Sequence, residues 1–335
     1  MKEVLPRIYC LQLPMGDFPP KSVNSYLIKG DNGCLLIDTG WDTEEVNKSF
    51  DKQIAQIGVR AGDIKQILLT HSHTDHGAQA GRIRRLSHAP IYLHKSEIPI
   101  LKARFICADT VCGDRFLKQT DLLLHSYGVP ATELEPPQPL LPDVKYLPLP
   151  DTALEGGEIV SFEDFNFLVI WTPGHSPGHV CYYEPTQRLL FSGDHVMPNI
   201  IPNISLHVQY VSNPLRDYLD SLEVLESLEV SLVLPGHGQP FSDLPQRAKE
   251  IVNHHHRLNT DILEVLNNGK IKSAYKIALA LPWPTPTGTT AWQNLTMWNR
   301  RFTVLEIIAH LEAMRFENKL DRVSRNNITR YHLHS

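Results

Sequence analysis

The first 94 residues alternate short apolar runs with segments of helical periodicity. The apolar runs have the length and composition of strands, and they lie at 7–13, 24–30, 33–40, 64–70 and 90–94. Residues 42–58 and 78–87 instead place apolar side chains at helical spacing. Thr43 or Asp42 is a candidate cap for the first of these helices, and Gly58 is its candidate stop. This alternation of strands and helices predicts an α/β fold.

The alternation of strand and helix patterns stops at residues 95–150. Segments 96–105 and 114–128 have helical patterns, and a proline-rich connector follows at 136–150. We interpret this stretch as a helical insertion that either roofs a site or fills surface. Strand patterns then resume around an amphipathic helix at 213–228, and they lie at 156–162, 165–171, 179–185, 188–193 and 230–236.

The last quarter of the chain differs in character. Helical patterns precede two strand patterns joined by a polar turn, which is the outline of a winged helix; the helices lie at 244–269, 272–281 and 303–316. From residue 245 onward there are 13 Lys/Arg against 7 Asp/Glu, although the whole chain has a net charge of −5. We therefore predict a main domain at 1–244 and a winged-helix-like domain at 245–335. The basic surplus is typical of a nucleic-acid-facing surface or of a solvated face.

Composition narrows the class of protein. The 335 residues, 42% hydrophobic and 21% charged, are enough to bury a substantial core. No apolar stretch approaches the roughly 20 residues that span a bilayer, and the first residues lack the apolar block of a secretory signal. The five cysteines are odd in number and scattered, which fits free thiols. We predict a cytoplasmic protein without a membrane partner.

The segment "HSHTDH" at 71–76 places three histidines and an aspartate directly after the apolar run 64–70. Three later strand patterns also end in Gly-containing turns that carry one ligand-type side chain each. In a layered α/β fold such strand ends gather at one edge of the sheet, where ligands bind. The seven candidate metal ligands are His71, His73, Asp75, His76, His175, Asp194 and His237.

The chemistry of these side chains suits divalent metals. Neutral imidazole and carboxylate favour zinc, and they also bind iron or manganese. The predicted ligand groups are His71, His73 and His175 for one ion, Asp75, His76 and His237 for a second, and Asp194 between them. Two ions roughly 3.5 to 4 Å apart can share a hydroxide and polarise a substrate oxygen together. The sequence therefore predicts a cofactor of two divalent metal ions.

These motifs resemble those of one protein family. "HSHTDH" matches the H-x-H-x-D-H signature of the metallo-β-lactamase superfamily, and "TPGHSPGH", "FSGDH" and "LPGHG" match its later motifs in order. "LIDTG", which contains Asp38, resembles the strand-turn that supports the site in that family. The resemblance covers about residues 5–245 and implies an αββα sandwich with a dinuclear site at the sheet edges. The C-terminal part resembles the winged-helix-like extension of the lactamase-beta-2-like branch.

Comparison with individual branches narrows the activity that the resemblance implies. The ligand set is similar to that of glyoxalase II proteins, although the segment after Asp194, "HVMPNIIPNIS", differs from theirs. True β-lactamases commonly have cysteine where Asp194 stands, and flavodiiron proteins have glutamate where His73 stands. These departures point away from antibiotic hydrolysis and from flavodiiron redox chemistry.

We predict a hydrolase in which a metal-bridging hydroxide attacks a thioester, ester or lactone. Asp75 would serve as ligand and as proton acceptor. His195 follows the bridging residue directly, and it would either donate a proton in catalysis or orient Asp194. The expected substrate is a small molecule or an acyl thioester, and the oligomeric state stays open.

The main alternative is a metal-dependent endoribonuclease or phosphodiesterase that binds RNA through the basic C-terminal domain. Arg322, Arg325 and Arg330 lie where a wing would contact phosphates. Two lesser alternatives are a single-iron dioxygenase, which would keep three of the ligands, and a nucleic-acid-binding regulator with a vestigial site.

Some further side chains have competing interpretations. His254, His255 and His256 are adjacent, and on a helix they point about 100° apart, so they cannot all bind one ion; we interpret them as a helix surface. Packing is the favoured role for the tryptophans of the proline-rich segment 281–298 and for Tyr210. His179 is expected to be structural.

Overall fold

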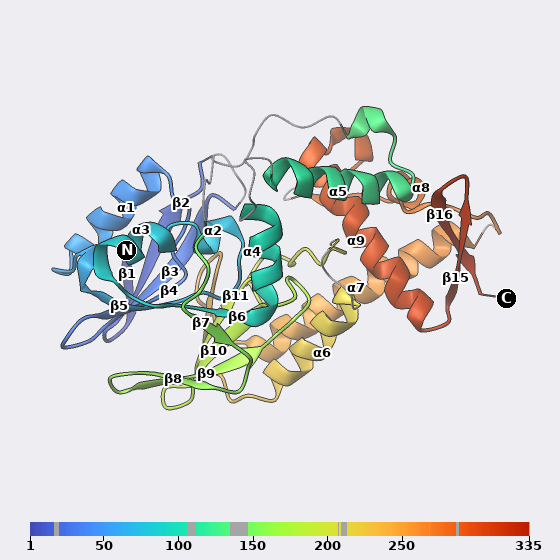
Figure 1. Ribbon diagram of the computed structural model, residues 1–335. Coiled ribbons are helices and arrows are strands. Elements are labelled where there is room, and N and C mark those ends of the chain that lie inside the picture. Colours follow the sequence, from blue (N-terminus) through green and yellow to red (C-terminus); the bar gives the residue numbers. More distant parts are fainter. Residues whose placement is uncertain are drawn as a thin grey trace.

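Two facing sheets form the larger part of the protein, on the left in Figure 1, and the C-terminal helices lie on the right. The computed structural model describes residues 1–16, 20–105, 112–134, 147–206, 208, 213–267, 269–285 and 288–334. Tyr210 and most of the proline-rich connector at 136–150 lie outside the described residues.

Within the described residues, the first sheet has the strand order β1-β2-β3-β4-β5-β6-β7. Its strands are β1 (Lys2–Leu5), β2 (Ile8–Pro14), β3 (Ser22–Lys29), β4 (Cys34–Ile37), β5 (Ile64–Leu68), β6 (Ile91–His94) and β7 (Thr152–Leu154). β1 to β4 pair antiparallel, whereas β4 to β7 pair in parallel. The parallel half therefore brings the ends of β4, β5 and β6 to one edge of the sheet.

The second sheet has the order β12-β11-β10-β9-β8 in the part of the chain that the structure describes. Its strands are β8 (Ile159–Phe162), β9 (Phe165–Trp171), β10 (Val180–Glu184), β11 (Leu189–Gly193) and β12 (Leu232–Pro235). β10 pairs antiparallel with both β9 and β11, and β11 pairs in parallel with β12. Because β9, β11 and β12 run in one direction, the turns that follow them lie at the same edge.

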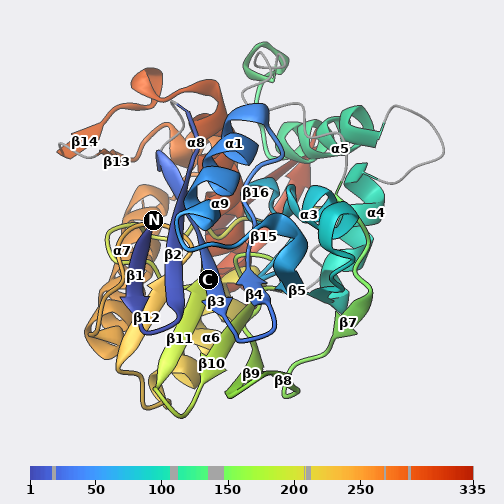
Figure 2. The same ribbon diagram turned by 90° about the vertical axis from the view of Figure 1, so that its left-hand side faces the viewer.

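Helices cover the outer faces of both sheets (Figures 1 and 2). α1 (Glu44–Ala55) and α3 (Ala80–Ser87) pack on the first sheet, and α6 (Pro214–Glu226) packs on the second together with the first turns of α7 (Leu244–Leu266). A separate apolar layer between the sheets includes Tyr26, Leu35, Phe167, Tyr182 and Phe191. This is the predicted αββα sandwich, and it follows from strands with one apolar face toward each layer.

The C-terminal part has an apolar core of its own. α8 (Ala274–Ala278), α9 (Met297–Phe316), the last turns of α7 and the hairpin of β15 (Leu320–Arg325) and β16 (Ile328–Leu333) contribute to it. α7 also sends Ala248 and Ile251 into the layer on the second sheet. The predicted division at 244/245 therefore falls at the start of a helix that packs in both parts, and it stays a prediction.

The two helices of the insertion at 95–150 pack in different parts of the protein, one on the sandwich and one in the C-terminal core. α4 (Ile98–Phe105) lies beside the sandwich and buries Leu101 against the first sheet. α5 (Cys112–Ser126) instead packs on α9 and β16, with Leu124 in the C-terminal core. An ion pair of Arg301 with Asp121 joins α9 to α5. The second half of the insertion is thus part of the C-terminal packing.

The structure adds detail to the C-terminal part and corrects one expectation for it. The proline-rich segment 281–298 contains a short hairpin of β13 (Trp283–Thr285) and β14 (Gly288–Thr290). Trp283 and Trp292 are buried in the core, as the packing interpretation predicted. The interpretation of 254–256 as a helix surface is wrong for His255, which is fully buried between α7 and α9.

None of the described helices is both long enough and apolar enough to cross a bilayer.

Candidate metal centre

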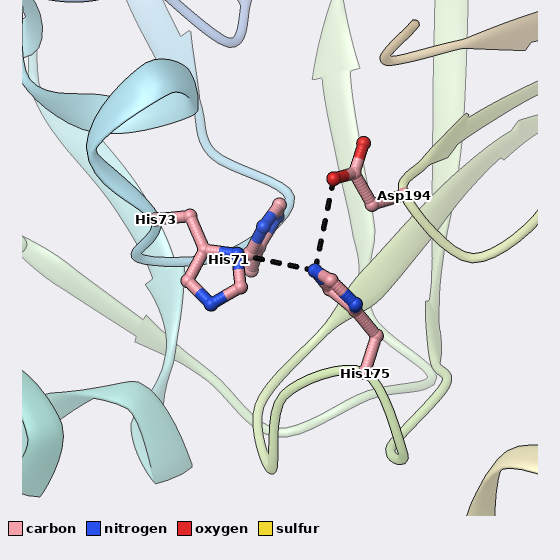
Figure 3. A group of neighbouring side chains, drawn as sticks. All are labelled: His71, His73, His175 and Asp194. Atoms are coloured by element: carbon pink, nitrogen blue, oxygen red, sulfur yellow. Dashed lines mark hydrogen bonds and ion pairs between the residues drawn. The ribbon is translucent and has the colours of Figure 1, made fainter. Parts of the chain in front are cut away.

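The seven predicted ligands come together at the common edge of the two sheets. His71 and His73 lie in the turn after β5, and Asp75 and His76 lie in the short helix α2 (Thr74–Gly77) that follows. His175, Asp194 and His237 follow β9, β11 and β12 respectively. Figure 3 shows four of these side chains, which point toward one another from the turns after β5, β9 and β11. We call the seven residues the strand-end cluster.

The strand-end cluster consists of two groups. Within each group, one ligand atom of every residue lies within 4.8 Å of the others. The groups are His71, His73, His175 and Asp194, and Asp75, His76 and His237. The two carboxylate oxygens of Asp194 face different groups. Its Oδ2 lies 3.6 Å from His175 Nε2, whereas its Oδ1 lies 3.3 Å from His76 Nε2 and 3.5 Å from His237 Nε2. Asp194 thus stands between the two groups.

Three ligand-type atoms of the cluster are buried without a hydrogen bond to any described residue. These are His71 Nε2, His76 Nε2 and Asp194 Oδ1. Buried polar atoms normally have a hydrogen bond, so three such atoms in one place fit a bound cation. The ring nitrogens His73 Nδ1 and His175 Nε2 are 3.1 Å apart, close to the roughly 3.3 Å between two nitrogens on one tetrahedral zinc ion.

An oxygen holds the far side of the ring in His76, His175 and His237. Asp38, in the left-handed conformation with φ 56°, accepts a hydrogen bond from His76 Nδ1 at 2.8 Å. The carbonyl of Asn203 accepts from His175 Nδ1 at 3.1 Å, and that of Ser22 accepts from His237 Nδ1 at 2.8 Å. Such partners fix the ring tautomer and aim the other nitrogen at a metal.

Glu97 is a supporting residue that the sequence did not indicate. Its buried carboxylate accepts hydrogen bonds from Ser72 N at 3.0 Å and from Gly178 N at 2.7 Å, and the Ser72 hydroxyl also donates to it. It therefore ties the turn that carries His71 and His73 to the turn that carries His175. A single glutamate beside a helical pattern gives no sequence signal for this role.

Close approach of the backbone explains one glycine of the cluster. A Cβ at Gly236 would lie 2.6 Å from Asp194 Oδ1 and 2.7 Å from His76 Cε1. Any side chain there would displace the ligand groups.

His179 and His195 lie behind the ligands. His179 contacts the Thr172 hydroxyl at 2.8 Å, and its Nε2 accepts from Asp194 N at 3.2 Å. His195 is fully buried, and its ring packs against those of His179 and Tyr218, with centroids 5.6 and 4.6 Å away. This position fits a role of His195 in orienting Asp194 better than a role in proton donation. The catalytic role of His195 stays a prediction.

The electrostatics of the cluster suit metal binding. Burial and neighbouring imidazoles hold the pKa values of His71 and His73 well below their usual range. Burial acts to raise the pKa of Asp194, but His237 and His76 outweigh it and hold that pKa well below the usual range. Neutral His71 and His73 are in the protonation state that binds a divalent ion. Burial acts to lower the pKa values of His76 and His237, but the neighbouring carboxylates outweigh it and raise them, so these two imidazoles would release a proton when an ion binds.

Comparison with known families agrees with this geometry. Residues 18–237 match the family model described as the metallo-beta-lactamase superfamily. The chain belongs to the metallo-β-lactamase superfamily. The predicted family and its αββα fold are thereby confirmed, and so is the class of metal-dependent hydrolase.

Individual relatives extend the similarity. The chain is 27% identical over 264 residues to "Probable metallo-hydrolase YqjP" of Bacillus subtilis (strain 168), which covers 76% of this chain and 79% of that protein. The metallo-beta-lactamase family protein TTHA1429 from Thermus thermophilus, which has a crystal structure, is 29% identical in sequence to this chain. It covers 99% of this chain and 100% of its own, with a TM-score of 0.82. A beta-lactamase domain protein from Burkholderia ambifaria shares the fold, at 23% identity, 99% and 94% coverage, and a TM-score of 0.78.

Proposed function

We propose that the protein is a dinuclear metal hydrolase that acts on an ester, thioester or lactone. The observation that carries this proposal is the position of Asp194, whose two oxygens face the two histidine groups. A carboxylate so placed can bridge two ions. The proposed ligands are His71, His73 and His175 for one ion, Asp75, His76 and His237 for the other, and Asp194 for both.

The donor set favours zinc. Every proposed donor is an imidazole nitrogen or a carboxylate oxygen, without any thiolate, which suits zinc and also admits iron or manganese. Two such ions, when bound, supply an acidified water as nucleophile and polarise the substrate oxygen.

Asp75 is the residue proposed to accept a proton. Its side chain keeps 19% of its surface exposed, against 10% for Asp194, and its Oδ2 lies 3.3 Å from His237 Nε2. It therefore occupies the open side of the cluster, where it can receive a proton from water or pass one to a leaving group.

A positive charge beside the site supports an anionic acyl substrate. The guanidinium of Arg104, on α4, interacts electrostatically with both Asp75 and His73. Burial lowers the pKa of Arg104, but an arginine remains charged at neutral pH. A carboxylate or phosphate on the substrate could thus be held near the bond that is cleaved.

RNA as substrate has less support. Arg322 pairs with Glu312 at 3.2 Å, and Arg330 donates to the carbonyls of Arg325 and Ile328 at 2.7 and 3.2 Å. Two of the three arginines expected to contact phosphates are therefore engaged within the protein. Arg325 is exposed at the turn of the hairpin.

The test is elemental analysis of protein purified without chelator, with the same sample assayed on anionic thioesters, esters, lactones and RNA. Hydrolysis of one acyl class that is lost on chelation and restored by zinc, manganese or iron would support the proposal. Cleavage of RNA alone would replace the substrate class. Iron with no hydrolysis of any substrate would indicate the dioxygenase, and RNA binding without metal or turnover would indicate the regulator.

A further inference from the structure

A second group of ligand-type side chains lies between α7 and α9. α7 contributes His255 and Asn259, and α9 contributes Glu306 and His310. Each pair is four residues apart in sequence, so its two side chains lie on the same face of their helix. His255 and His310 are fully buried, whereas Glu306 is partly buried. We call His255, Glu306 and His310 the interhelical cluster.

The distances in this cluster fit a shared ion. One ligand atom of each residue lies within 4.8 Å of the others. His255 Nδ1 and His310 Nε2 are 3.2 Å apart, which is close to the roughly 3.3 Å edge of a tetrahedral zinc site. The corresponding distance between His73 and His175 in the strand-end cluster is 3.1 Å. The two imidazole pairs therefore have the same spacing.

The surroundings orient His310 toward its two neighbours. Its Nδ1 lies 2.7 Å from Asn259 Oδ1, an amide oxygen that accepts a hydrogen bond. The lone pair of His310 is then on Nε2, the nitrogen that faces His255. A ligand histidine typically donates its other N–H to an oxygen in this way.

The cluster lacks a balancing positive charge among the described residues. Burial lowers the pKa of His255 to about 3 and holds that of His310 well below its usual range, so both rings are neutral. Burial also raises the pKa of Glu306 to about 8. A divalent cation would displace the proton of Glu306, balance the charge of the resulting carboxylate and use the imidazole lone pairs.

We propose that His255, Glu306 and His310 bind a further divalent transition-metal ion, separate from the strand-end cluster. Two imidazoles and one carboxylate, with a position left for water, are a donor set typical of zinc. Because α7 packs in both apolar cores, the ion would brace the C-terminal helices against the sandwich.

Contacts of His255 with α6 connect the interhelical cluster to the strand-end cluster. The Tyr218 ring of α6 stands edge-on to the His255 ring, with centroids 5.7 Å apart. Its hydroxyl donates to the carbonyl of His195 at 2.7 Å, next to Asp194 in the chain. A metal that fixes His255 would thus help to fix the turn that carries Asp194.

The test compares metal content per chain in full-length variants purified without chelator. His310→Asn and Glu306→Gln should each contain about one ion fewer than the wild type. His256→Asn is the matched control, since His256 is exposed on the same helix, and it should retain the wild-type content. Circular dichroism checks that each variant is folded.

A second measurement separates this site from the strand-end cluster. In metal-free Asp194→Ala protein, calorimetric titration with zinc should still show a tight equivalent, which Glu306→Gln in the same background removes. Equal zinc binding with and without the Glu306 change would overturn the proposal. So would wild-type metal content in both His310→Asn and Glu306→Gln.

Discussion

The strand-end cluster and the interhelical cluster each pair two imidazoles at nearly equal spacing, 3.1 and 3.2 Å, but the chain builds them differently. Turns after several strands supply the first, so many ligands converge and one side stays open. Two helices supply the second, and each presents side chains four residues apart from a rigid face. The first arrangement suits catalysis, which needs room for substrate and water. The second suits a fixed brace.

Among the variants considered, Asp194→Ala should have the largest effect on activity. Loss of the carboxylate between the two histidine groups should reduce kcat/KM by about 10³-fold or more, because metal activation of water and substrate contributes several kcal/mol. Asp261→Ala, at an exposed position on α7, is the control. Activity within tenfold of wild type in Asp194→Ala would contradict the catalytic assignment of the strand-end cluster.

Glu97→Gln should have the next largest effect. The amide can no longer accept from both Ser72 N and Gly178 N, so the two ligand turns lose their common anchor. Changes at groups that orient ligands typically reduce activity or metal affinity about 10- to 100-fold. Steady-state kinetics and zinc competition with a chelator would measure the loss. Glu155→Gln, an exposed partner of Lys95, should change neither.

Arg104→Gln should affect substrate binding and leave metal content unchanged. We expect KM for an anionic acyl substrate to rise about 10- to 150-fold, since one charge-assisted hydrogen bond contributes about 1.5–3 kcal/mol. A substrate with the same type of scissile bond but without the negative charge should be hydrolysed as before. Lys102→Gln, exposed on the same helix, is the matched control. An equal rise in KM for charged and neutral substrates would argue against anion recognition by Arg104.

Glu306→Gln should have the smallest effect, and its sign should depend on metal. In chelated wild-type protein Glu306 loses its proton near pH 4.5 when unfolded but only at about pH 8 when folded. The contribution of Glu306 to folding stability therefore falls as pH rises from about 5 to 8 and then stays constant. The neighbouring His254, His255 and His310 have lowered pKa values, so their contribution rises with pH up to about 6.5 and opposes that of Glu306 in this range. The comparison with a Glu306 variant isolates the contribution of Glu306.

The chelated Glu306→Gln variant should thus melt above the wild type by a margin that widens up to about pH 8, by roughly 2–4 °C per kcal/mol. In zinc-loaded protein the order should reverse, because the ionised carboxylate is then a ligand. Differential scanning calorimetry at pH 5 and pH 8, with and without zinc, measures both differences. The same order of melting temperatures in both conditions would speak against a metal at this cluster.

Sequence patterns predicted the α/β fold and the residues of the strand-end cluster, and the family resemblance of those motifs implied the αββα sandwich. Apolar runs marked the strands, and each ligand followed a run within a Gly-containing turn, so one-dimensional spacing already implied a common sheet edge. Of the two predicted caps of α1, the structure selects Thr43, which accepts from Val46 N. The helix itself ends at Ala55, three residues before the predicted stop Gly58, which has φ 72° in the turn that follows.

Only the tertiary structure determined the contacts between segments that no local pattern connects. Glu97 supports two ligand turns, α5 packs into the C-terminal core, and His255 meets a histidine 55 residues later in the chain. Helical periodicity shows that neighbouring residues point in different directions, but it does not show which direction is covered by another helix. For that reason the three adjacent histidines resembled a surface, although the middle one is buried against α9.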